Sequence, residues 1–160
     1  MVGHSSGAHI AISALAQIER SAAFDQAPAT VGFLSLGQVI PMVGFLSNVG
    51  QLRRDLYDIS RSTAIYWVDI TAPGDGCSFS LCDPVAVSAL PLAGQTGPLV
   101  LSAAFSQALS PTRWRRLRWR FFKLHFQYLC AFDETHHYDY FAITAGPITL
   151  RKRFCNRKPS

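Results

Sequence analysis

The residues with the clearest chemical potential stand at the start of the chain, where residues 3–7, Gly-His-Ser-Ser-Gly, fit the pattern G-x-S-x-G. In the turn for which this pattern is typical, a strand bends sharply into a helix and presents the central serine at its tip. The strained backbone there requires small residues two positions to either side. The pattern predicts Ser5 as a nucleophile for acyl transfer, with the backbone N–H of Ser6 as an oxyanion donor at the start of a helix.

The same five residues have a second interpretation, because glycine and serine are common and the pattern arises by chance in many chains. The alternative is a glycine-rich loop that caps a buried helix. The context favours the nucleophile, since an apolar helix follows directly and two strand–helix alternations come after it. His4 and His9 flank the motif, and we expect them to pack near it.

Four segments of the chain resemble lipase-like α/β-hydrolases of bacterial type. Val2–Ala11 is similar to their nucleophile turn, and Leu34–Pro41 to the strand and turn that follow it. Trp67–Asp75 resembles the strand whose C-terminal end delivers the catalytic acid, and His125–Tyr128 is similar more loosely. The resemblance implies the C-terminal part of an α/β-hydrolase fold and serine esterase or lipase activity on a carboxylester or lipid-type substrate.

The resemblance also implies a triad in the chain order nucleophile, acid, base. Asp75 is the acid that we expect, because it lies just past a strand in a Pro-Gly-Asp-Gly turn. An aspartate before glycine is equally a favoured turn residue without any catalytic role. Asp83 is the second choice, and Asp69, inside the strand, is expected to be structural.

Three positions remain open for the base. His125 shares a helical face with Phe121 and Tyr128, so we expect it to point inward, where it is either the base or a hydrogen-bonded core residue. The family places its histidine on a loop after the last strand, whereas His125 falls in a predicted helix. His136 and His137 lie on a polar loop, which suits a base better but also predicts ordinary solvated histidines.

In this family the second oxyanion donor comes from a loop upstream of the nucleophile. We expect that loop to lie before Met1 and to be missing here, and the loss of one such donor typically costs about 10²–10³ in kcat. We therefore expect this chain alone to have little or no hydrolase activity. The expected partner is a missing N-terminal portion of the same domain.

The pattern of apolar residues predicts the elements that position these side chains. Residues 6–22 are apolar on nearly every face and predict a buried helix, and Asn48 and Ser110-Pro111 are typical helix starts. We predict helices over 6–22, 48–60 and 110–132, strands over 30–36, 64–70 and 98–101, and an irregular remainder. This alternation indicates an α/β fold with about three parallel strands and flanking helices, a partial α/β-hydrolase fold. It spans residues 1–150, followed by a basic flexible tail over 151–160.

The composition fits one folded domain, because hydrophobic residues make up 49% of 160 residues and charged residues only 16%. Two uncharged stretches, 26–52 and 84–112, are broken by prolines, glycines and polar residues, which argues against a membrane span. The first residues do not have the pattern of a signal peptide, and the four cysteines match no zinc pattern, so we expect reduced thiols and a cytoplasmic protein.

The net charge of +5 is concentrated in the C-terminal part of the chain. Over residues 113–126, arginines and a lysine alternate with aromatic residues, a pattern that favours association with an anionic membrane surface over nucleic acid, which we do not expect to bind. The alternative is a half-buried helix whose arginine stems cover apolar surface. Residues 133–139 are expected to be a solvated loop without a metal, and we expect no cofactor. A non-catalytic membrane-surface or protein-interaction domain on the same fold is the second functional hypothesis.

Overall fold

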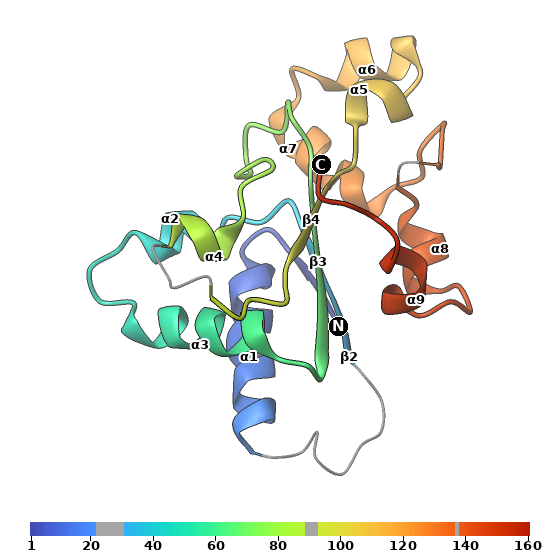
Figure 1. Ribbon diagram of the computed structural model, residues 1–160. Helices are drawn as coiled ribbons and strands as arrows, with labels where there is room; N and C mark the ends of the chain where they lie inside the picture. The colour runs from blue at the N-terminus through green and yellow to red at the C-terminus, as the bar shows by residue number, and fades with distance from the viewer. Residues whose placement is uncertain (22–30, 89–92, 137) are drawn as a thin grey trace.

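The computed structural model describes residues 1–21, 31–88, 93–136 and 138–160. The described residues form one parallel sheet with its strands in sequence order (Figure 1). The predicted α/β fold with flanking helices is thereby confirmed. The strands are β1 (Val2–His4), β2 (Val31–Leu36), β3 (Ile65–Thr71) and β4 (Leu99–Ser102).

The register aligns the C-terminal ends of β1, β2 and β3 at one edge of the sheet. His4 pairs with Leu36, and Leu36 in turn pairs with Ile70. The loops that leave the strands at this edge carry Ser5 and Asp75. Ligands and reactive groups of open α/β sheets lie at this edge, outside the carboxyl ends of the strands.

The helices that connect the strands cover one face of the sheet. They are α1 (Gly7–Arg20), α2 (Ile40–Gly44), α3 (Gly50–Arg61) and α4 (Pro84–Val87). Connections between parallel strands are right-handed. When each new strand is added at the same edge of the sheet, as here, all the connecting helices therefore lie on the same face. Ile12 and Leu56 on this side pack against Phe33 and Trp67 of the sheet.

The opposite face is covered by the chain that follows β4. Leu34, Leu36, Val68 and Ile70 project from the sheet into a second core, which Tyr128 helps to close from the other side. This C-terminal cover comprises α5 (Phe105–Ala108), α6 (Pro111–Leu117), α7 (Phe121–His125), the 3₁₀ helix η1 (Phe126–Leu129), α8 (Tyr140–Thr144) and α9 (Leu150–Phe154). Figure 1 shows α8 and α9 of this C-terminal cover on the far side of the sheet from α1 and α3, and α5 and α6 beyond the C-terminal ends of the strands.

The single helix predicted over 110–132 is wrong. The chain leaves the helical conformation at Arg120, with φ −105° and ψ 73°, and divides into α6, α7 and η1. The break turns the second half so that Leu124 and Tyr128 reach the core, while Trp119 remains 72% exposed. The start of the helix is confirmed, because Ser110 Oγ accepts from the Arg113 N–H.

Other element predictions need correction as well. Helix α1 has the predicted buried stripe, but it is not covered all round, since Ile10 is 63% exposed. Helix α3 begins at Gly50 with no side-chain cap, so Asn48 is not its cap. The remainder is not irregular, because side chains of Asp139 and Thr149 cap α8 and α9. The predicted ends at residues 22 and 30 lie outside the described residues.

Within the described ranges, no helix has both the length and the apolar character needed to cross a membrane.

Candidate functional site

Ser5 lies at the junction of β1 and α1 in a backbone conformation that residues other than glycine rarely adopt. Its φ is 55°, in the left-handed region. The Ser5 N–H still donates to the Leu36 carbonyl at 2.9 Å, as the last hydrogen bond of the ladder between β1 and β2. Two residues later α1 begins. The sharp turn between strand and helix that the motif predicts is therefore present.

The two glycines of the motif are under different constraints. A Cβ at Gly3 would lie 2.8 Å from Ala8 Cα and 2.9 Å from the Gly7 carbonyl oxygen, so any side chain there would collide with α1. A Cβ at Gly7 would meet no atom of the described residues within 4 Å. The expectation that both positions must be small is therefore correct for Gly3 and wrong for Gly7.

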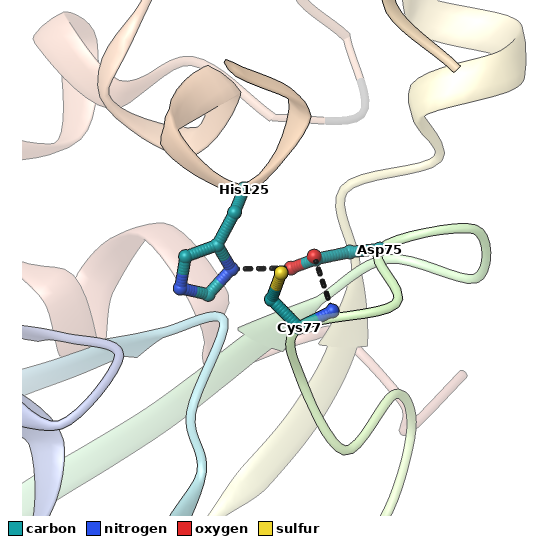
Figure 2. Close-up of side chains that lie close together, drawn as sticks. All are labelled: Asp75, Cys77 and His125. Carbon is teal, nitrogen blue, oxygen red and sulfur yellow. Dashed lines mark hydrogen bonds and ion pairs between the residues drawn. The ribbon is translucent and has the colours of Figure 1, made fainter. Parts of the chain in front are cut away.

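Asp75 and His125, predicted as acid and base, are in direct contact although they lie 50 positions apart in the chain. His125 Nδ1 lies 2.8 Å from Asp75 Oδ2, and both residues are buried (Figure 2). Asp75 follows β3 in a turn, and His125 is the last residue of α7. The break before α7 is therefore what brings the imidazole to the edge of the sheet.

Two further donors hold the Asp75 carboxylate. The Cys77 N–H donates to Oδ1 at 3.0 Å, and the Tyr128 hydroxyl donates to Oδ2 at 3.0 Å. Burial by itself raises the pKa of Asp75, but the hydrogen bonds from His125 and from the Cys77 N–H outweigh it and hold the pKa below its ordinary value. Asp75 is thus ionised at neutral pH and acts only as an acceptor.

The ionised carboxylate fixes the tautomer of His125. Because Asp75 can only accept, the neutral form of the imidazole carries its proton on Nδ1 and its lone pair on Nε2. Nε2 is buried and has no hydrogen-bond partner among the described residues. Figure 2 shows this nitrogen on the side of the ring away from Asp75. The site therefore contains a buried imidazole whose second nitrogen makes no hydrogen bond to any described residue.

Ser5 and the imidazole have the same neighbours. The His4 ring lies against the His125 ring, with centroids 4.6 Å apart, and His4 Nε2 donates to the His125 carbonyl oxygen at 3.0 Å. Just after the end of β2, a Cβ at Gly37 would lie 3.1 Å from His125 Cε1. Since neighbouring strands lie about 4.8 Å apart and Leu36 pairs with His4, Gly37 lies beside Ser5.

Of the three predicted catalytic residues, Asp75 and His125 are thus in direct contact, and Ser5 lies at the same end of the sheet. Within the described part of the chain, Ser5 Oγ makes no hydrogen bond to His125 Nε2, since that nitrogen has no partner. Catalytic hydrogen bonds are often long without a bound substrate and tighten when it binds. Ser6, the predicted oxyanion donor, is the N-cap of α1, and its N–H belongs to the unpaired first turn of the helix.

Asp83, the second choice for the acid, and Asp69 have structural roles. Asp83 caps α4 by accepting from the Val85 and Ala86 N–H groups. Asp69 is fully buried within β3 and accepts from Ser35 Oγ, and burial raises its pKa to about 7. Neither carboxylate contacts a histidine in the described residues, in contrast to Asp75.

His136 is the other candidate base that the structure describes. His136 is exposed and lies 3.7 Å from Glu134, as expected for a solvated loop, and His137 is outside the described residues. His9 is half-buried on α1, and burial lowers its pKa.

Three residues of the site were missed by sequence reasoning. Gly37, with φ 51°, leaves the space that the rings of Tyr128 and His125 fill. The hydroxyl of Tyr128 was assigned no partner, although its spacing from His125 placed both on one face. The side chain of Cys77 lies beside Asp75 and His125. A signal for its position was available, because an Asp side chain in such a turn commonly accepts from the backbone two residues on.

A cavity of about 360 Å³ opens next to Asp75. Its aromatic lining comes from α6, from the segment that joins α6 to α7 and from the start of α7, and the turn around Asp75 lines it as well. The lining residues are Gly74, Asp75, Gly76, Trp114, Arg118, Trp119 and Phe121.

No protein-family model, no curated protein and no solved structure matches the chain.

Proposed function

We propose that the chain carries a serine-hydrolase site of the α/β-hydrolase kind, which acts on a carboxylic ester or a lipid-type ester. The observation that carries the proposal is the buried Asp75–His125 pair beside a serine held at positive φ between a strand and a helix. The strained serine and the buried pair are both costly to maintain in a fold that has no use for them.

In the proposed reaction His125 Nε2 removes the proton of Ser5 Oγ as the oxygen attacks the ester carbonyl carbon. Asp75 keeps the imidazole in the required tautomer and stabilises the imidazolium that forms. The Ser6 N–H stabilises the oxyanion. His125 then returns the proton to the departing alcohol, and water releases the acid from Ser5 through the same steps.

A fluorophosphonate probe tests the nucleophile, because it modifies a serine only when a neighbouring base activates it. We expect slow covalent labelling of the full chain, located at Ser5 by mass spectrometry of the peptide that contains it. Ser5→Ala abolishes the labelling. Ser6→Ala is the matched control, since it removes an exposed neighbouring hydroxyl but keeps the backbone N–H.

The acid is tested by Asp75→Asn, which keeps the shape of the side chain but permits the wrong imidazole tautomer. By analogy with the effect of this change in serine proteases, we expect the labelling rate to fall by about 10³–10⁴-fold. Equal labelling of Ser5→Ala and the unsubstituted chain, or no labelling of a chain shown to be folded by circular dichroism, would overturn the proposal.

A second candidate function is association with an anionic membrane surface, and one observation favours it. The side chains of Trp119 and Phe122 are 72% and 78% exposed, and Phe121 and Phe126 are exposed beside them. Arginines and Lys123 alternate with these aromatic residues. Exposed aromatics with surrounding cations are the composition that binds the interface of anionic lipids.

Co-sedimentation with vesicles tests this surface. We expect the chain to bind vesicles that contain phosphatidylserine and to be released by salt. The double variant Trp119→Ser, Phe122→Ser should lose binding, whereas Phe45→Ser, which removes a 63% exposed ring from the end of α2, should not. Loss of binding in the Phe45 variant as well would show that general exposed hydrophobicity, and not this surface, is responsible.

A further inference from the structure

We propose that Asp75, Cys77 and His125 bind one Zn²⁺ ion, and that this ion switches the imidazole into the tautomer that cannot act as a base. One carboxylate oxygen, the Cys77 sulfur and one imidazole nitrogen all lie within 4.8 Å of one another. Figure 2 shows the sulfur beside the Asp75 carboxylate that the His125 nitrogen contacts. Metal binding itself is independent of Ser5 and of any hydrolase activity.

The donor set suits zinc. Thiolate, imidazole and carboxylate are its three protein ligands, and three of them with an open fourth position is the arrangement of accessible zinc sites. A thiolate and a carboxylate also balance the charge of the ion, with a neutral imidazole as third ligand. A soft thiolate disfavours Mg²⁺ and Ca²⁺, which prefer oxygen ligands.

The geometry requires only a small local adjustment. Bonds of about 2.0–2.3 Å in a tetrahedron place ligand atoms roughly 3.3–3.8 Å apart. The contact between His125 Nδ1 and Asp75 Oδ2, now 2.8 Å, must open, and the widest separation in the cluster, at most 4.8 Å, must close. Asp75 and Cys77 lie two residues apart in one turn, where the Cys77 N–H already bonds the carboxylate.

The carboxylate keeps its supports when the ion is bound. Tyr128 O–H and Cys77 N–H continue to donate to Asp75 and orient it, as outer groups do around most protein zinc sites. Burial of Asp75 and His125 keeps competing water away from two of the three ligands. Burial, followed by the nearby Asp75 charge, raises the pKa of Cys77, so the free site holds a thiol.

The proton balance of binding is simple. The Cys77 thiol releases its proton to the solvent as the Zn–S bond forms. The ion takes the lone pair of His125 Nδ1, and the proton of that nitrogen is transferred to Nε2 through solvent. The imidazole neither gains nor loses a proton overall, and no electron is transferred. Nε2 then carries a proton and can no longer accept one from Ser5.

Cobalt(II) provides a readout that does not depend on activity. We expect one Co²⁺ to bind per chain and to show a thiolate-to-metal charge-transfer band together with the strong visible bands of tetrahedral cobalt, and Zn²⁺ to displace it. Cys77→Ser should lose the charge-transfer band and weaken Zn²⁺ binding at least tenfold in calorimetry. Cys82→Ser, a half-buried cysteine in the same loop, is the matched control and should keep both.

The effect on the base rests on the proposed function and is tested separately. Zn²⁺ should slow fluorophosphonate labelling of Ser5, and a chelator should restore it. In Cys77→Ser, zinc should have little effect relative to the zinc-free rate of that variant. Ser5→Ala should bind Co²⁺ as the unsubstituted chain does. The cobalt measurement therefore tests the metal site even if the hydrolase proposal fails. Failure of the folded chain to give the charge-transfer band, or an undiminished band in Cys77→Ser, would overturn the zinc site.

Discussion

Asp69 should make the protein less stable at high pH. Its side chain is fully buried in β3, where Ser35 Oγ donates to one oxygen and the other has no partner among the described residues. Burial raises its pKa from the ordinary 3.8 to about 7. At 1.36 kcal/mol for each pKa unit, this difference corresponds to about 4 kcal/mol.

The sign follows from which state loses its proton first. Below about pH 4 the carboxyl group is protonated in both states, and its burial carries no charge penalty. As the pH rises, the unfolded chain ionises first, while the folded chain holds the proton until about pH 7. The free energy of unfolding therefore falls across this interval and remains low above it.

Urea denaturation at pH values between about 4 and 8 measures this effect, with Asp69→Asn as the comparison. The asparagine keeps an oxygen that accepts from Ser35 but cannot ionise. We expect the wild-type chain to lose about 4 kcal/mol relative to Asp69→Asn over this interval. Asp58→Asn, which removes an exposed partner of Arg20, should keep the wild-type slope. Equal slopes for wild type and Asp69→Asn would refute the assignment of a neutral buried carboxyl.

The glycines and the tyrosine of the site give three further expectations. Gly3→Ala should cost roughly 1–3 kcal/mol in urea denaturation because its Cβ meets α1, whereas Gly7→Ala should be neutral or up to about 1 kcal/mol stabilising. Gly37→Ala should cost at least about 2 kcal/mol, since its φ is 51° and its Cβ would lie 2.6 Å from Tyr128 Cε2; an unchanged melting temperature would contradict the packing. Tyr128→Phe should cost about 1.5–3 kcal/mol because the Asp75 carboxylate loses one donor, and labelling of the serine should slow in parallel.

The sheet and the helices that connect its strands could be predicted from sequence because their signal is local. Residues of β2 and β3 are apolar in continuous runs, as strands covered on both faces must be. Helix α3 has a buried stripe at helical spacing and a polar opposite face. In each case, the residues that determine the element lie within it.

The C-terminal cover could not be predicted in the same way. The aromatic residues over 110–132 have helical spacing throughout, and nothing in that spacing marks the turn at Arg120. The turn exists because Leu124 and Tyr128 are buried against β2 and β3, far away in sequence. The contact of Asp75 with His125 was expected from family resemblance and chain order, whereas the Tyr128 and Cys77 contacts depend on positions that only the folded chain defines.

The residues of the candidate site come from two different parts of the fold. Ser5 and Asp75 follow strands of the sheet, but His125 belongs to the cover that closes the second core. A partial opening that detaches this cover, at a free energy below that of global unfolding, would withdraw the base while the sheet and α1 stay intact. Amide hydrogen exchange of α7 should then report the lifetime of a competent site. The capacity for proton transfer would be governed by the docking equilibrium of one C-terminal segment and not by the stability of the whole domain.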